Sequence, residues 1–111
     1  MSHETFSLNW KTHEARIKKY FQNLFNEHVF SDVTLVCDDQ TQLQAHKIVL
    51  SVCSPVLRKI LLNNPHQHPL IYLRGVKQQE MQAILQFMYL GEANIFQGRI
   101  SQFIVTAQPQ P

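Results

Sequence analysis

The sequence is poor in the features that mark catalytic and metal-binding proteins. It has only three glycines, so it contains no glycine-rich loop that could cradle a phosphate. Its two cysteines, Cys37 and Cys53, form no CxxC pair and lie in apolar stretches, which favours buried free thiols over a disulfide or a redox site. None of its six histidines stands at zinc-ligand spacing, and we expect neither a metal nor any other cofactor.

Three potential nucleophiles, Ser51, Cys53 and Ser54, stand close together in the middle of the chain. They have no glycine elbow, and no acid or base lies at a recognisable spacing from them. Core packing and helix capping explain these residues better. We therefore expect that this chain is not an enzyme.

A long hydrophobic run and a strong excess of charge are also missing. No apolar stretch approaches the roughly 20 residues needed to span a bilayer, and the N-terminus has no signal-peptide core. Ten Lys and Arg are scattered among the chain against eight Asp and Glu, a net charge of +2. These charges form no basic patch of the kind that binds nucleic acid. We expect an intracellular protein that contacts neither membranes nor nucleic acid directly.

Apolar residues are plentiful enough for one core, since they make up 44% of the 111 residues. Within the central stretch, residues 33–37 form an apolar, β-branched run, residues 38–40 supply turn chemistry, and residues 43–45 resume in extended form. This pattern predicts a β-hairpin. From His46 the apolar residues are too continuous for a surface helix, which predicts a short helix buried on nearly all sides.

Before this stretch lies the clearest amphipathic helix of the chain, for which Thr12 is a suitable N-cap. Its apolar positions recur with helical spacing at Ile17, Tyr20, Phe21, Leu24 and Phe25. After the stretch, Pro55 opens a short helix that reaches residue 62, and residues 70–73 form a short strand.

The last third of the chain contains a helix over residues 78–90, which Gly91 ends. Residues 93–96 are a candidate strand, and an apolar stripe over residues 100–107 predicts a final helix. Together these elements predict an α/β (α+β) protein.

The first residues alternate in polarity, so that Phe6, Leu8 and Trp10 share one side of a predicted strand. Such a strand, with three large apolar side chains, either docks on its own domain or pairs with another chain. A second open question concerns Asp32 and Lys47, which the hairpin brings back together. They could form an ion pair at the rim of the apolar unit, or both could be exposed end residues.

These features resemble a BTB/POZ domain. The matching motifs are FSDVTL at residues 30–35, AHKIVLSVCSP at residues 45–55 and FMYLGE at residues 87–92. FSLNW at residues 6–10 and NPHQHP at residues 64–69 are similar to the tramtrack/bric-à-brac subgroup of transcription-factor BTB domains. The domain is expected over residues 1–107, followed by a tail at residues 108–111, with the usual final helix of the family missing.

The resemblance implies a helical core flanked by a small sheet, and a dimer in which the first strand of each chain pairs with a late strand of the other. It also implies that Asp32 and Lys47 form a charged pair beneath the dimer groove. The implied interface residues are Phe6, Leu8, Trp10, Ile17, Tyr20, Phe21, Leu50, Asn94, Ile95 and Phe96.

The function implied by the resemblance is protein–protein interaction in a nuclear transcription or chromatin regulator. The expected partners are a second copy of the chain, with assembly beyond the dimer, then related BTB domains, and corepressor or chromatin proteins. The alternative is a substrate adaptor for a cullin-3 ubiquitin ligase, a role that typically needs helical surface beyond the BTB core.

Overall fold

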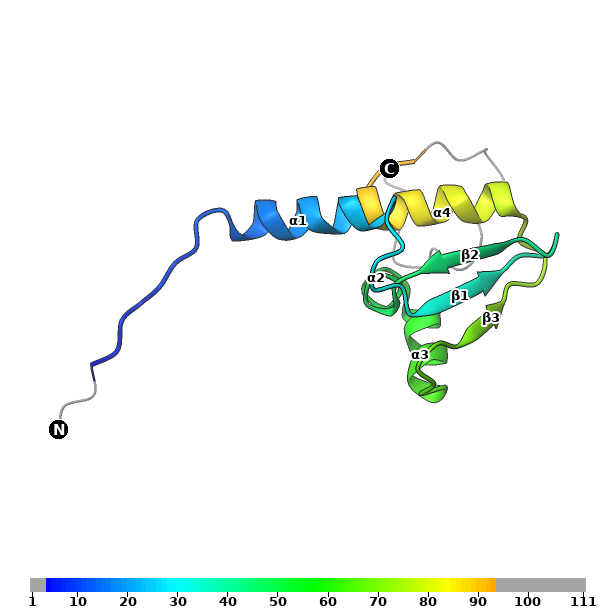
Figure 1. Ribbon diagram of the computed structural model, residues 1–111, viewed down its shortest axis with the longest axis horizontal. Coiled ribbons are helices and arrows are strands. Elements are labelled where there is room, and N and C mark those ends of the chain that lie inside the picture. The colour runs from blue at the N-terminus through cyan, green and yellow to red at the C-terminus, as the bar shows by residue number, and fades with distance from the viewer. Residues whose placement is uncertain (1–3, 94–111) are drawn as a thin grey trace.

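The computed structural model describes residues 4–93 of the chain (Figure 1). Several predictions therefore fall outside the described residues or run past their end. They are the strand at residues 93–96, the helix at residues 100–107, the tail, and the interface residues Asn94, Ile95 and Phe96. In chain order the elements are α1 (His13–Leu24), β1 (Val33–Val36), β2 (Gln42–Ala45), α2 (Lys47–Cys53), α3 (Pro55–Asn63), β3 (Leu70–Tyr72) and α4 (Gln78–Leu90).

The three strands form one mixed sheet in the order β2-β1-β3. β1 pairs antiparallel with β2, with Val33 opposite Ala45, and parallel with β3, with Thr34 opposite Leu70. Because β1 is the central strand, all four of its residues are buried. The predicted hairpin is therefore confirmed, and its turn contains Gln40 in the left-handed region at φ 69°.

Helices α2 and α4 pack together beside this sheet, and the C-terminal end of α1 meets α4 (Figure 1). The core draws on every one of these elements. Its largest fully buried apolar side chains are Leu35, Leu50, Leu57, Leu73, Met81 and Ile84. The helix predicted at residues 78–90 is present with those bounds, and Gly91 ends it at φ 85°.

Ser54 separates α2 from α3. Its backbone is extended, at φ −134° and ψ 112°, and its buried hydroxyl accepts a hydrogen bond from the Leu57 N–H at 3.2 Å. Pro55 occupies the first turn of α3, where the missing N–H costs nothing. The capping role predicted for this serine is thus confirmed, and the cap fixes the angle between the two helices.

Two local predictions differ from the structure. Helix α2 is not buried on nearly all sides: Val49 and Leu50 enter the core, but Ile48 and Val52 are 59% and 68% exposed. A helix of two turns has room for only one face against the core. Thr12 does precede α1, yet its side chain makes no capping hydrogen bond, because its backbone lies at φ −98° and ψ 11° instead of the extended region.

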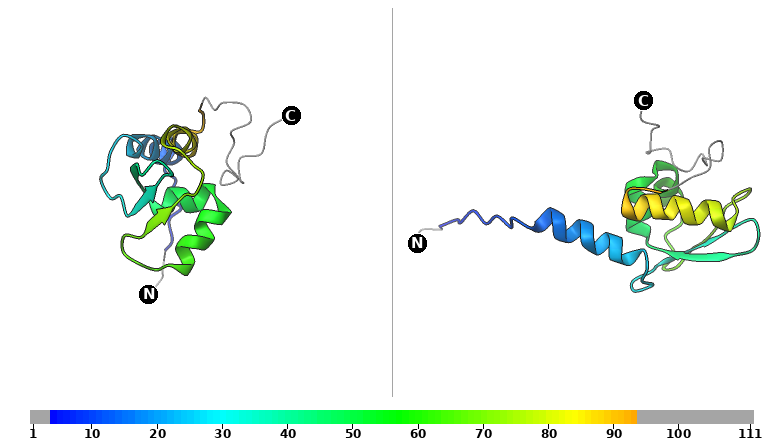
Figure 2. Two further views of the ribbon diagram at one scale, coloured as in Figure 1. Left: turned by 90° about the vertical axis from the view of Figure 1, so that its right-hand side faces the viewer. Right: turned by 90° about the horizontal axis from the view of Figure 1, so that it is seen from above.

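The extended N-terminal segment and α1 project away from the rest of the molecule (Figures 1 and 2). The radius of gyration is 17.0 Å, against about 13 Å for a compact domain of 100 residues. Residues 5–10 are extended but have no strand partner within the described chain. No helix of the described residues is long and apolar enough to cross a bilayer.

The Ser54 cap can be tested by replacing the residue with alanine. Ser54→Ala should lower the free energy of unfolding by about 1–2 kcal/mol, because the buried Leu57 N–H loses its acceptor. Ser51→Ala is the matched control in the preceding helix and should change stability by less than about 0.5 kcal/mol. Urea unfolding measures both values. Equal stability of the two variants would contradict the capping role.

Candidate interaction surface

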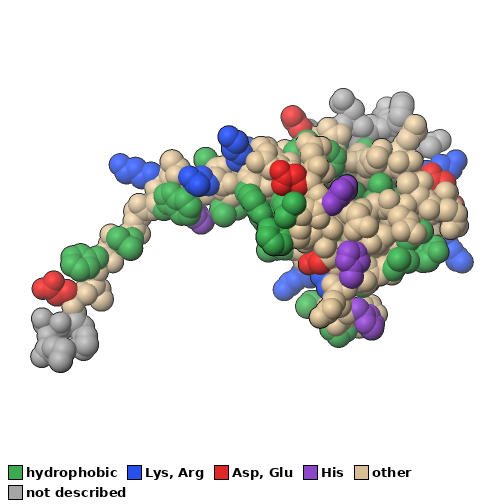
Figure 3. Space-filling view, viewed as in Figure 1, with side chains coloured by type: hydrophobic (Ala, Val, Ile, Leu, Met, Phe, Trp, Pro, Cys, Tyr) green, Lys and Arg blue, Asp and Glu red, His purple; other side chains and the backbone are tan. Residues whose placement is uncertain are grey.

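The N-terminal segment displays its apolar side chains to solvent. Phe6, Leu8 and Trp10 are 80%, 93% and 57% exposed, and hydrophobic side chains follow one another along this arm in Figure 3. Trp10 packs against α1 of its own chain: its ring centroid lies 5.5 Å from that of His13 and 5.3 Å from the Arg16 Cζ. The segment is therefore anchored at Trp10 and uncovered before it.

The apolar stripe of α1 changes its environment along the helix. Toward the C-terminal end, Leu24 is buried, and the Phe25 ring, just past the helix, lies 5.7 Å from the Tyr89 ring of α4. Toward the N-terminal end, Ile17 and Tyr20 are each close to half exposed. One end of the helix thus belongs to the core, and the other keeps apolar surface that the described chain does not cover.

Leu50, predicted at the interface, requires a correction. Its side chain is fully buried in the core and has no surface to offer a partner. The exposed apolar positions of α2 are its neighbours Ile48 and Val52, which the sequence reasoning did not select. Their signal is the continuous apolar run from Ile48 to Cys53, which predicts a helix buried on nearly all sides and so does not single out these two positions.

Asp32 and Lys47 do meet, but through the backbone. The Lys47 N–H donates to Asp32 Oδ1 at 2.7 Å, so the carboxylate caps the start of α2. The Lys47 ammonium instead donates to the carbonyl of His66, in the loop before β3. The sequence placed the two residues together correctly, but the predicted pairing of their charges is replaced by these two contacts.

A buried histidine lies next to this cap. The His46 N–H donates to the Tyr89 hydroxyl at 2.9 Å, and the His46 Nδ1 lies 2.7 Å from the same hydroxyl. Its Nε2 lies 2.7 Å from the Val29 carbonyl. A carbonyl can only accept, so Nε2 carries the hydrogen, and in the neutral ring Nδ1 accepts the hydroxyl proton. Burial raises the pKa of Tyr89 to about 12.

The loop over residues 64–69 is joined to the body at two points. Besides the contact of Lys47 with His66, the Nε2 of His68 lies 2.9 Å from the hydroxyl of Thr34 in the central strand. These contacts use the histidines and the backbone of the loop to hold it in place. Among the described residues, no three His, Cys, Asp or Glu side chains gather in a way that could hold a metal ion.

The cysteines have the environment of structural thiols. Cys37 is buried and Cys53 is half-buried, and neither is in a disulfide. Burial raises the pKa of both thiols, so the thiolate form that would react is disfavoured. The burial predicted for both thiols is confirmed for Cys37, whereas Cys53 is only half-buried.

Comparison with known proteins decides the family. The BTB/POZ domain family matches residues 21–109 of the chain. The chain is a member of the BTB/POZ family. A BTB/POZ domain is a protein–protein interaction domain, which agrees with a structure whose unusual feature is uncovered apolar surface.

The relatives and a solved structure support this BTB/POZ assignment. Longitudinals lacking protein-like of Drosophila melanogaster is 43% identical over 106 residues, covering 96% of this chain and 83% of the relative. The tramtrack protein, alpha isoform, and the sex determination protein fruitless, from the same organism, are 36% and 39% identical over 97% and 95% of this chain. The matched region spans only 13% and 11% of the lengths of these two relatives.

The BTB domain of human Gigaxonin has the same fold. The two structures share a TM-score of 0.65 at 23% identity, over 88% of this chain and 80% of the other. The predicted BTB/POZ fold, with its helical core and small sheet, is thus confirmed, as is the resemblance to the tramtrack group.

Removal of the Tyr89 hydroxyl tests the contact with His46. Tyr89→Phe leaves the His46 N–H and Nδ1 without their partner, and we expect the free energy of unfolding to fall by about 1–3 kcal/mol. Tyr72→Phe removes an exposed hydroxyl and should change stability by less than about 0.5 kcal/mol. Chemical unfolding followed by circular dichroism gives both values, and a loss in Tyr72→Phe as large as in Tyr89→Phe would refute the assignment.

The raised pKa of Tyr89 also predicts a pH dependence. Its ordinary value is 10.0 and its folded value about 12, so the unfolded chain releases the proton first as the pH rises. The contribution of Tyr89 to stability is therefore complete below pH 10 and is lost between pH 10 and about 12. Unfolding midpoints across this range should decline less steeply in Tyr89→Phe. Parallel declines in both proteins would contradict the prediction.

Proposed function

We propose that the chain forms a homodimer in which the N-terminal segment of each copy is covered by the other. The observation that carries this proposal is the exposure of Phe6, Leu8 and Trp10 on an extended segment without a strand partner in the described chain. Burial of each such side chain contributes roughly 1.5–3 kcal/mol. A second copy of the chain exposes the same apolar segment, so each copy can cover the segment of the other.

Two further elements enlarge the proposed interface. Ile17 and Tyr20 lie on the end of α1 that projects from the core, and Ile48 and Val52 lie on the exposed face of α2. Stable interfaces bury about 800 Å² on each partner. Three separate elements with uncovered apolar side chains offer more surface toward such an interface than the N-terminal segment offers alone.

Strand exchange is the geometry that suits the N-terminal segment best. Residues 5–10 are already extended, so pairing with a partner strand costs little further ordering. Their backbone N–H and C=O groups, which pair with no strand of the described chain, can form the hydrogen bonds of an added strand. The resemblance implies that the partner's residues Asn94, Ile95 and Phe96 would receive them, and these residues lie outside the part of the chain that the structure describes.

We further propose that this dimer serves a nuclear transcription or chromatin regulator. The support is the similarity to tramtrack and to fruitless, a sex determination protein, with motifs of the tramtrack subgroup at both residues 6–10 and 64–69. The partners proposed are related BTB domains and corepressor or chromatin proteins. These relatives do not favour the cullin-3 adaptor, and strong capture of cullin-3 by the purified chain would reverse that preference.

Light scattering on the purified chain tests the dimer. The wild-type chain should have at least twice the monomer mass at micromolar concentration, with larger multiples where dimers assemble further. A variant with Phe6, Leu8 and Trp10 changed to serine should have the monomer mass while keeping its helical circular dichroism. The matched control changes Leu62, Leu70 and Tyr72, which are also exposed, to serine and should stay dimeric. A monomeric wild type, or a dimeric triple N-terminal variant, would refute the proposal.

A further inference from the structure

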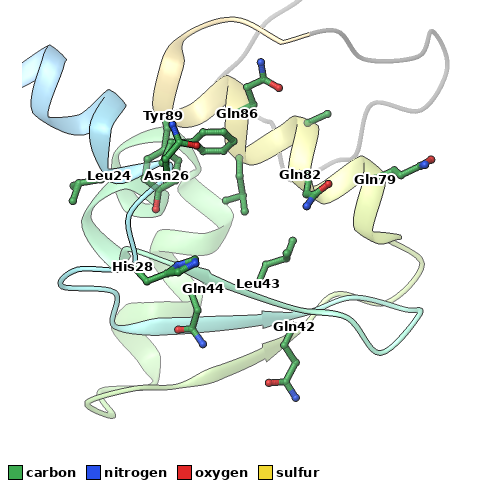
Figure 4. Close-up of a pocket in the computed structure, with 13 residues that line it drawn as sticks. Leu24, Asn26, His28, Gln42, Leu43, Gln44, Gln79, Gln82, Gln86 and Tyr89 are labelled. Carbon is green, nitrogen blue, oxygen red and sulfur yellow. The ribbon is translucent and has the colours of Figure 1, made fainter.

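A groove with a volume of about 720 Å³ runs between α4 and the edge of β2 (Figure 4). This volume is within the range of sites that bind small ligands and short peptides. Its apolar lining includes Leu43 and Leu85, and its polar lining consists mainly of side-chain amides and His28. Among the residues that the structure describes, no Asp, Glu, Lys or Arg lines it. The groove is therefore built for an uncharged occupant.

One wall of the groove is an open sheet edge. Within the described chain β2 has a neighbour on one side only, namely β1. The Thr34 N–H donates to Pro69 O, and Val36 O accepts from the Leu73 N–H, so both residues turn their backbone groups toward β3. Gln44 and Gln42 stand opposite them in the antiparallel pair. By the alternation of such pairs, their N–H and C=O groups point away from β1, at the open edge.

The side chains of β2 agree with this orientation. Leu43 points toward α4, whereas the Gln42 and Gln44 side chains point away from the helix (Figure 4). Both glutamines nevertheless line the groove. These two residues therefore line the groove with their backbone at the edge of the strand. Together they offer two N–H donors and two C=O acceptors.

The opposite wall carries a row of amides. Gln79, Gln82 and Gln86 lie on α4 at spacings of three and four residues and all line the groove. Gln82 points its amide toward β2, whereas the side chain of Gln86 points away from the strand (Figure 4). The row extends about 10 Å along the helix, and the four residues of β2 extend about 13 Å. An extended segment lying between the two walls would therefore meet the amide row and the strand edge over the same length.

We propose that this groove binds an extended, uncharged peptide segment of another protein as an additional strand on β2, with glutamine or asparagine side chains turned toward α4. The backbone of the peptide would pair with Gln42 and Gln44, the mode of recognition called β-augmentation. Its alternate side chains, about 7 Å apart, would meet the amides of α4. An amide offers both a donor and an acceptor, so it pairs with another amide without a charge.

The chemistry of the lining disfavours other occupants. A charged side chain would lose its water without gaining an opposite charge, which is costly. An amphipathic helix would leave the donors and acceptors of the β2 edge unused, since all of its own backbone groups are already paired. An extended amide-rich strand uses both walls at once.

Fluorescence anisotropy with a labelled, amide-capped peptide of sequence Ser-Gln-Thr-Gln-Val-Gln-Thr-Gln-Ser tests the proposal on the full chain. We expect saturable binding, together with slower hydrogen exchange at the Gln42 and Gln44 amides when the peptide is present. The same peptide with proline at alternate positions cannot donate to the strand and should not bind. Absence of saturable binding by the first peptide would overturn the proposal.

Two variants locate the site on the protein. Gln42→Pro removes one outward N–H at the first residue of an edge strand, where proline is tolerated, and should weaken binding about tenfold. Gln82→Lys places a charge in the amide row and should weaken binding by a similar factor. Gln67→Lys, on the exposed loop before β3, is the matched control and should bind like wild type. Circular dichroism checks that each variant is folded.

Three results would contradict this assignment. Folded Gln42→Pro and Gln82→Lys variants that both bind like wild type would place the peptide elsewhere. If Gln67→Lys weakened peptide binding as much as Gln82→Lys, the loss would come from the added net charge and not from the amide row. Exchange protection at Gln42 and Gln44 that rises with protein concentration in the absence of peptide would show that a second copy occupies the edge instead.

Discussion

The hydroxyl of Tyr89 joins parts of the chain that are far apart in sequence, and the rest of the structure depends on this contact. From the last turn of α4 it pairs with both the backbone N–H and the ring of His46, immediately before α2. The other side of the His46 ring contacts the Val29 carbonyl. The backbone N–H of the next residue, Lys47, donates to the Asp32 carboxylate. The start of α2 is thus fixed against α4 and against the segment that leads into β1.

This fixed position of α2 decides which surfaces remain free. With Val49 and Leu50 directed into the core, Ile48 and Val52 necessarily face outward. The contact of Phe25 with Tyr89 holds the end of α1 at the same place, so the rest of α1 projects from the domain. The uncovered apolar surface therefore follows from the packing of the core, and it is the surface through which we propose that the domain associates.

Much of the fold could be predicted from the sequence because its signals are local. The helix at residues 78–90 has a regular apolar face and a glycine stop, and the hairpin has turn residues between two strand-like runs. The exposure of Ile48 and Val52 could not be predicted in this way. A short helix that is apolar all round has the same sequence pattern whether its second face meets the core or a partner. The hydrogen bond from the Lys47 backbone to Asp32 depends on the angle at which α2 begins, which spacing does not reveal.

The open edge of β2 illustrates the same limit. The sequence predicts the hairpin, but which of its strands lies at the edge depends on β3, a strand from further along the chain that pairs with β1 and places Leu70 opposite Thr34. Only the assembled sheet shows that, within residues 4–93, β2 has a neighbour on one side alone and that the amides of α4 lie beside it.

The central claim is that a second copy covers the N-terminal segment, and the fluorescence of Trp10 tests it most directly because the chain has one tryptophan. In a single copy this side chain is 57% exposed. The account predicts blue-shifted emission that acrylamide quenches poorly at micromolar concentration. Emission typical of indole in water, with unhindered quenching, would contradict it.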